Sequence, residues 1–458
     1  MRDLAFVGFL ATLIAFGFRR PFMFVLAYAY VDIVSPQRLS YYFLNSIPIS
    51  MIAAALAVVG WALFEDKKGT RVPLRQWLIL ILLVYVYFTT ANADFPIEAK
   101  DKWDWASKSL IWAFFLPLAL STRLRIEAYL LVMILAASAI IIVGGLKTAV
   151  SGGGGGYGTL VMFVDNNSGL FESSTISTVA IAIIPVILWL AKHGTVFPPD
   201  WRVRAFAYSL IFACLLIPVG TAARTGVICI AALGILMLRY TKRRVLYLGL
   251  VGLAGLAVIP LLPQSFTSRT ATISGYQADE SASTRLAIWA WTIDYANEHP
   301  LGGGFEAYRQ NKLKIQTVKI ETDGTIQTAQ ATQIEDAGRA YHSSYFEMLG
   351  EQGYPGLVLF LLIHGIGIFR MEVLRRRYKD SEDEPWLSPL ATALQSGHLV
   401  YLVGSLFVGI AYQPFVYMLV GTQIGLDTLV RRREREGRKQ PFVKPMAASP
   451  ATAELQPS

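Results

Sequence analysis

The sequence predicts an all-α integral membrane protein with about twelve transmembrane helices and a large, partly helical loop on the non-cytoplasmic side. Of its 458 residues, 54% are hydrophobic and 16% are charged, whereas soluble domains carry about 25% charged residues. Residues 126–143 are one of several long runs with almost no charge, and a hydrocarbon core of about 30 Å requires apolar helices of about this length. The third observation is that basic residues gather in alternate loops.

The apolar runs predict helices, because every backbone amide in lipid needs an internal partner and the alternation of a barrel strand is missing. The first two runs are short and are separated only by Arg19, Arg20 and Pro21, so residues 4–34 form either one broken span or two. The predicted spans are 4–18, 22–34, 47–64, 73–90, 107–121, 126–143, 175–190, 204–219, 225–238, 246–262, 355–369, 389–410 and 415–430.

Alternate loops are rich in Lys and Arg, which assigns them to the cytoplasm. These loops contain Arg19/Arg20, Lys67/Lys68/Arg71, Arg123/Arg125, Lys192/Arg202, Arg239/Lys242–Arg244, Arg370/Arg375–Arg377 and Arg431–Arg433. The opposite loops are 35–46, 91–106, 144–174, 220–224, 263–354 and 411–414.

Four regions follow from this topology. Residues 1–262 form an N-terminal transmembrane bundle, 263–354 a non-cytoplasmic loop with amphipathic helices, and 355–430 the C-terminal transmembrane helices. Residues 431–458 begin as a basic cluster suited to anionic lipid and continue as a Pro/Ala/Ser-rich tail that we expect to be disordered.

Two non-cytoplasmic segments have distinctive patterns. Residues 151–158 are nearly all glycine, which suits a flexible linker or a loop that wraps phosphate. In residues 283–297, Leu286, Trp289 and Ile293 recur at helical spacing. This pattern predicts an amphipathic helix at the membrane surface or capping the bundle.

The composition excludes several classes of function. The net charge of +9 is explained by the cytoplasmic loops, so no nucleic-acid partner is expected. Cys214 and Cys229 fall in apolar runs and offer no disulfide framework. The four histidines other than His342 lack the spacing of metal ligands, and the outer loops lack an Asp-x-Asp pair. Neither a metal nor a cofactor is therefore expected.

Arg224 and Arg285 are candidates for binding an anion. Arg224 occupies a tight outer turn, residues 221–226, where the distribution of basic residues does not predict an arginine. It either reaches toward lipid head groups or meets an anionic ligand. Arg285, at the start of the amphipathic helix, faces water, pairs with Asp279 or Glu280, or supplies a second planar fork for phosphate oxygens.

His342 is the candidate catalytic residue. It precedes the span at 355–369, near the outer membrane boundary, and on a helix it shares a face with Tyr345, Phe346 and Leu349. A neutral imidazole there can take a proton from a hydroxyl, although an isolated histidine at a helix head is also an ordinary polar residue.

These features in this order resemble the O-antigen ligase superfamily. The resemblance rests on the Arg224 turn, Thr284-Arg285 with Trp289, the block 299–304, and His342 followed by Glu351-x-Gly353-x-x-Gly356; it covers about residues 1–430. Residues 165–167 are similar to the family's Asp-x-Asn element, and residues 1–36 are similar to exosortase-associated O-glycosylation ligases. One position departs, because Ser343 stands where the family often has Asn.

The resemblance implies a metal-independent, inverting glycosyltransferase in the bacterial inner membrane, with its active site on the periplasmic side. The donor is a glycan on undecaprenyl diphosphate, and the acceptor is a lipid A–core sugar hydroxyl. The alternatives are an O-antigen polymerase and a ligase that acts on protein hydroxyls. Arg224 and Arg285 hold the diphosphate and His342 activates the hydroxyl, with Asn167, Tyr345 and Glu351 as supporting residues.

A hypothesis from a different functional class is that the protein is a lipid or polysaccharide transporter. It predicts charged residues within the spans and symmetry between the two halves. The spans are largely free of acidic residues, apart from Asp32 near one end, and we find no internal repeat.

Overall fold

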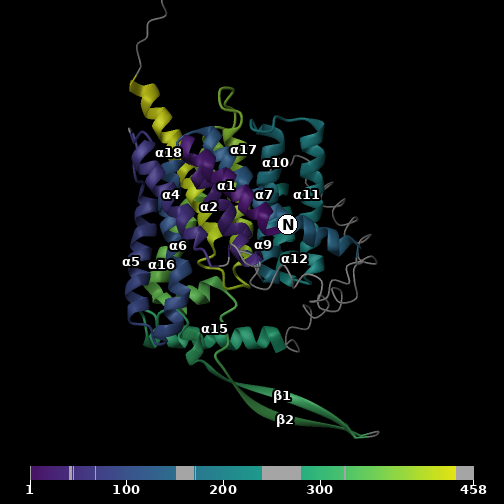
Figure 1. Ribbon diagram of the computed structural model, residues 1–458. Coiled ribbons are helices and arrows are strands. Elements are labelled where there is room, and N and C mark those ends of the chain that lie inside the picture. The colour runs from purple at the N-terminus through teal and green to yellow at the C-terminus, as the bar shows by residue number, and fades with distance from the viewer. Residues whose placement is uncertain are drawn as a thin grey trace, which may run out of the picture.

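The helices pack side by side in a bundle, and α15 lies across one end of this bundle (Figure 1). The computed structural model describes residues 2–40, 44, 46–67, 69–150, 170, 172–239, 280–323 and 326–439. The first group of helices is α1 (Arg2–Arg19), α2 (Phe22–Val34), α3 (Pro36–Leu39), α4 (Ile49–Phe64), α5 (Leu74–Ala91), α6 (Pro96–Ala119) and α7 (Arg123–Val150). Then come α9 (Ser173–Ala182), α10 (Ile184–His193), α11 (Trp201–Gly220), α12 (Arg224–Leu238), α15 (Glu280–Glu298), η3 (Ala307–Gln310), β1 (Lys312–Asp323), β2 (Ile326–Ala337), α16 (Ser344–Arg377), α17 (Leu387–Gly404) and α18 (Pro414–Lys439).

Helices occupy every predicted span except 246–262, which lies outside the described residues. Among the described helices, five are long and apolar enough to cross a membrane: α5, α7, the continuous α9–α10 segment, α11 and α16. Three shorter apolar helices, α2, α4 and α12, accompany them. Residues 4–34 form two helices, because α1 ends at Arg19 and α2 begins after Pro21.

The outer surface of the bundle is apolar and part of its interior is polar. On α5, Leu74, Trp77, Ile81, Val84 and Phe88 are exposed at a spacing of three or four residues. The opposite face of the same helix buries Arg75, whose guanidinium donates to Ile363 O (2.7 Å) and Gln423 Oε1 (2.9 Å). Such an arrangement suits lipid, in which exposed apolar side chains cost nothing and polar groups need internal partners.

Loops predicted to share a side of the membrane come together in space. Arg125 pairs with Glu65 (2.7 Å), Arg123 donates to His193 O (2.9 Å) and Arg432 donates to Ser121 O (2.8 Å), all at the end opposite α15. The compartment that each end faces remains a prediction.

The structure corrects one expectation and adds detail to two others. The class is not purely α, because β1 and β2 form an antiparallel hairpin that extends from the α15 end (Figure 1). The basic start of the C-terminal segment is helical, since α18 continues to Lys439, and the Pro/Ala/Ser-rich part expected to be disordered, 440–458, lies outside the described residues. The predicted amphipathic helix is present as α15. Its buried side chains are Ile288, Thr292, Tyr295 and Ala296, and Leu286 and Ile293 are exposed.

Candidate active site at the α15 end of the bundle

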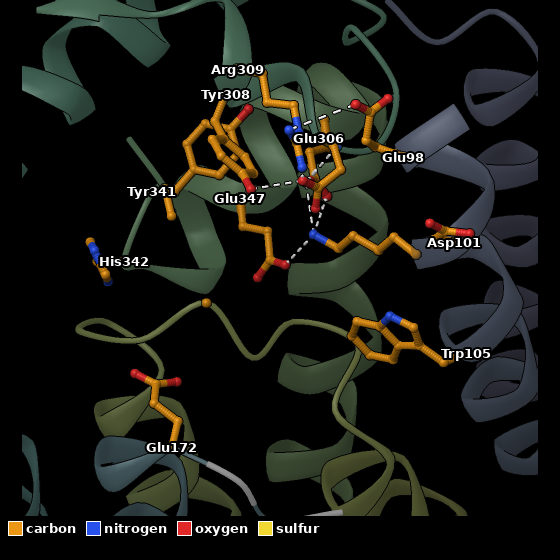
Figure 2. A pocket seen from close by; sticks show the side chains of 14 residues that line it. Glu98, Asp101, Trp105, Glu172, Glu306, Tyr308, Arg309, Tyr341, His342 and Glu347 are labelled. Carbon is orange, nitrogen blue, oxygen red and sulfur yellow. Dashed lines mark hydrogen bonds and ion pairs between the residues drawn. The ribbon is translucent and has the colours of Figure 1, made fainter. Parts of the chain in front are cut away.

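A cavity of about 560 Å³ lies at the α15 end of the bundle. Its walls come from α6, the residue before α9, the loop between α15 and β1, the start of α16 and the α17–α18 connection (Figure 2). The lining residues are Glu98, Asp101, Lys102, Trp105, Glu172, Glu306, Tyr308, Arg309, Ala340, Tyr341, His342, Glu347, Glu351 and Gly409.

The first turns of α16 are fixed against the α17–α18 connection. Ser344 N donates to Ser405 O (2.8 Å), and the Ser344 hydroxyl donates to Val408 O (3.0 Å) while accepting from Ile410 N (2.9 Å). One turn later, Glu347 Oε2 accepts from Ala411 N (3.1 Å). These buried bonds fix the carboxylate of Glu347 at the cavity wall.

Lys102 joins α6 to α16 through two carboxylates. Its Nζ lies 2.6 Å from Glu347 Oε1 and 2.7 Å from Glu351 Oε1, and only 11% of its side chain is exposed. A buried ammonium between two buried carboxylates compensates the charge of one of them, so the cluster is anionic when both are ionised.

The loop Gly302–Gly304, which follows α15 and is called the glycine loop below, docks on a break in α16 and completes this cluster. Gly353 has a φ of 62° and a ψ of −168°, which interrupts the helix. Gly303 N donates to Gly350 O (3.1 Å) and Gly304 N to Glu351 O (2.9 Å), so the loop satisfies carbonyls that the break leaves without helical partners. The loop then places Glu306 N 3.1 Å from Glu351 Oε1.

The rim beyond Glu351 is also charged. Glu306 Oε2 accepts from the Tyr308 hydroxyl (2.7 Å) and from Arg309 Nε (3.0 Å), and Arg309 reaches Glu98 at 3.7 Å. Both cations of the lining are therefore already paired with carboxylates of the lining.

His342 lies two residues before α16 and is not part of the helix. Its φ is 50°, and its neighbour Tyr341 is held by α15, because Trp289 Nε1 donates to Tyr341 O (2.9 Å). Trp289 also stacks on Phe346, with ring centroids 4.8 Å apart. In Figure 2, His342 and Asp101 lie at opposite sides of the cavity.

The charges around His342 favour its neutral form. Burial, and then the positive charges of Arg285 and Arg339, lower the pKa of His342 below its ordinary value of 6.5. The imidazole is therefore free to accept a proton at neutral pH. Burial has the opposite effect on Glu172 and raises the pKa of that carboxyl, against a hydrogen bond from Thr175 and the charge of Arg285.

Backbone strain is concentrated at this cavity. Among the described residues, five other than glycine have a positive φ, and three of them line the cavity: Glu172 (79°), Glu306 (64°) and His342 (50°). A fourth, Ala222, lies two residues before Arg224. Such conformations persist where the surrounding structure enforces them, and they cluster at functional sites.

Comparison with known families finds two matching regions of the chain. Residues 208–361 match the family O-Antigen ligase, and residues 1–195 match a family of unknown function, DUF5935. Residues 208–361 belong to the O-antigen ligase superfamily. No curated protein matches the chain.

The region that matches the O-antigen ligase family contains Arg224, Arg285, His342, Glu347 and Glu351. Lys102 and Glu172, which also line the cavity, lie in the N-terminal region. Together with the apolar helices, the match indicates a multi-pass membrane protein with a ligase- or polymerase-type function.

The two predicted arginines are not part of the cavity lining. Arg285 lies close enough to lower the pKa of His342. Arg224 is the first residue of α12, and the turn that precedes it packs against α9, because the Ser177 and Thr221 hydroxyls lie 2.9 Å apart. Because α9 begins directly after Glu172, Arg224 lies at the same end of the bundle as the cavity.

The predicted supporting residues have different outcomes. Glu351 lines the cavity, where it pairs with Lys102. The Tyr345 hydroxyl instead donates to Leu402 O (3.1 Å) and does not line the cavity, because α16 begins at Ser344 and the helical face expected for His342 does not exist. Asn167 and the glycine run lie outside the described residues.

Sequence reasoning missed Lys102, Glu347 and Glu306 in this cavity. Lys102 had a usable signal, since it is a basic residue in the predicted outer loop 91–106, the same exception that identified Arg224. Among the described residues, no group of three or more His, Cys, Asp or Glu side chains is arranged to hold a metal ion.

Proposed function

We propose that the protein transfers a glycan from undecaprenyl diphosphate to a hydroxyl group, with a lipid A–core sugar as the acceptor. The reaction takes place on the periplasmic side of the bacterial inner membrane and needs no metal. A second lipid-linked glycan and a protein hydroxyl are the other acceptors that an O-antigen ligase-type enzyme would use.

The observation that carries this proposal is the placement of His342. Of the described residues that line the cavity, His342 has the only imidazole. It lies within the influence of Arg285, and its pKa is lowered by burial and by that arginine. A neutral base beside a cationic group suits a reaction that removes a proton from a hydroxyl while a diphosphate departs.

The proposed step balances without a general acid. The acceptor oxygen attacks the anomeric carbon from the side opposite the diphosphate, and its proton passes to His342. The bond between the anomeric carbon and the diphosphate oxygen breaks, and the leaving group keeps the electron pair as an anion. Arg224 and Arg285 stabilise that charge, and the attack inverts the anomeric centre.

The test is transfer by the purified protein in proteoliposomes that contain undecaprenyl-diphosphate-linked glycan and a lipid A–core acceptor. We expect the glycan label to move to the acceptor, with its anomeric configuration inverted, in excess EDTA. Strict dependence on Mg²⁺ or Mn²⁺ would contradict the two-arginine scheme. Movement of the label across the bilayer without transfer would support a transporter instead.

A further inference from the structure

The lining of the cavity beside His342 is mainly acidic. It contains six carboxylates, those of Glu98, Asp101, Glu172, Glu306, Glu347 and Glu351, and two fixed cations, Lys102 and Arg309. Lys102 is bound to two of the carboxylates and Arg309 pairs with two others. The cations therefore have little capacity left for an incoming anion.

The arginines assigned to the diphosphate lie outside this lining. Arg285 and Arg339 lower the pKa of His342 without being part of the cavity wall, and Arg224 begins α12 beside α9. His342 therefore lines an acidic cavity and also lies within the influence of two arginines that are not part of its wall. The two substrates of the proposed reaction differ in charge in the same way, because the donor contains a diphosphate and the acceptor contributes a hydroxyl.

Resting on the function proposed above, we infer that the cavity takes the acceptor, as a sugar that is neutral or bears an amine and has no phosphate or carboxylate. Bringing like charges together costs affinity and suppresses wrong partners. An ammonium group would instead gain from Asp101 and the other carboxylates of the lining, whereas the diphosphate is held by Arg224 and Arg285, which lie outside the lining. The charge of the lining determines acceptor specificity.

The cavity has the shape and chemistry for such a group. Its volume of about 560 Å³ is in the range of small-molecule sites. Trp105 provides an aromatic face, and carboxylates provide hydrogen-bond acceptors for sugar hydroxyls. In Figure 2 the carboxylates of Glu172 and Asp101 approach the cavity from different sides.

The experiment compares three acceptors that share one alkyl chain: a glucoside, a glucosaminide and a glucoside 6-phosphate. Binding of each to the purified full-length protein in detergent is measured by thermophoresis, and transfer from lipid-linked donor is measured in proteoliposomes. We expect the phosphorylated acceptor to bind at least about tenfold more weakly than the glucoside at low salt, with the difference shrinking as ionic strength rises.

Two variants and a control assign this preference to the lining. Glu98→Gln and Asp101→Asn each remove one charge at the rim of the cavity and should narrow the difference between the two acceptors several-fold. Asp104→Asn removes an exposed charge from the same helix, outside the lining, and should leave it unchanged.

The outcomes separate this inference from the function on which it rests. Equal or tighter binding of the phosphorylated acceptor overturns the inference, even if transfer occurs. Discrimination between the two acceptors that both Glu98→Gln and Asp101→Asn leave unchanged overturns it as well. Discrimination in binding without transfer to any acceptor supports the acidic cavity and contradicts the proposed reaction.

Discussion

The imidazole of His342 is held in a sparsely populated backbone conformation just before a helix. Its φ of 50° brings the side chain to the cavity wall, while Trp289 fixes the carbonyl of the preceding residue. The helix itself begins at Ser344 and is bound to the α17–α18 connection. The proposed base is held in place in this way and would lose little freedom on binding an acceptor.

The pH dependence of transfer reports on this imidazole. Burial, Arg285 and Arg339 lower the pKa of His342, so the rate should fall on the acid side only below pH 6.5. Removing one positive charge stabilises the imidazolium form, so Arg285→Gln should raise this pKa and move the acid limb to higher pH. The measurement is kcat/KM between pH 5 and 8, and an unshifted acid limb in this variant would contradict the assignment.

Arg224→Lys tests whether a planar fork is needed at the start of α12. An ammonium keeps the charge but cannot form two parallel bonds to phosphate oxygens. We expect kcat/KM for the lipid-linked donor to fall about a hundredfold. Arg204→Lys, at an exposed position of α11 outside the cavity lining, is the control and should retain activity. Wild-type activity in Arg224→Lys would favour a lipid anchor.

At the residue scale, the sequence identified side chains that break an expected distribution. Arg224 stands out because outer turns lack arginine, and His342 stands out before an apolar span. Nothing in the sequence distinguishes Glu347 and Glu306 in this way. They become part of one cavity through Lys102 and the glycine loop, contacts between residues as much as 249 positions apart.

At the element scale, the break in α16 determines where the carboxylates lie. Gly353 adopts a conformation that is essentially restricted to glycine, and a Cβ there would lie 2.2 Å from Pro300 O. A Cβ at Gly302 would lie 2.5 Å from Glu351 O, so the loop and the break approach each other backbone to backbone. The glycines at 302 and 353 are thus explained by packing.

Gly353→Ala should lower the stability and activity of the protein together. Backbone strain and the clash with Pro300 should reduce the free energy of unfolding by about 3 kcal/mol or more. Thermal unfolding in detergent measures this change. Gly365→Ala on the same helix, where nothing lies within 4 Å of the new Cβ, is the matched control. Equal melting temperatures for the two variants would show that the break is not required.

The orientation of α15 could not be derived from its pattern. Leu286, Trp289 and Ile293 mark an apolar stripe, yet the buried positions are Ile288 and Thr292. Periodicity detects a helix but does not say whether an apolar face meets protein or lipid. The exposed Leu286 and Ile293 fit the predicted position at the membrane surface.

At the scale of the whole molecule, the alternate loops form two chemically distinct ends. One end is held by arginine pairs such as Arg125–Glu65 and Arg370–Asp427. The other end contains the acidic cavity, α15 and the hairpin (Figure 1). Hydrophobic runs and basic loops predicted the helices of this bundle. They carry no signal for the hairpin, whose only mark in a polar segment is the short alternation of Leu313/Ile315 and Val318/Ile320 with polar residues.

Cysteine labelling tests the predicted orientation. Glu298→Cys lies at the α15 end and Asp383→Cys in the α16–α17 connection, both at exposed positions, while native Cys214 and Cys229 are buried. A membrane-impermeant maleimide added to intact spheroplasts should label the first variant and not the second. Permeabilised membranes, in which both sites should react, are the control. The reverse pattern would place the cavity in the cytoplasm.

The proposed mechanism depends most directly on His342, so the decisive measurement is glycan transfer by His342→Gln in proteoliposomes, with donor binding measured on the same preparation. We predict that transfer falls by a factor of about 10² to 10⁴ while donor affinity is retained. His299→Gln, a nearby imidazole outside the cavity lining, should transfer normally. Wild-type transfer by His342→Gln would contradict the mechanism.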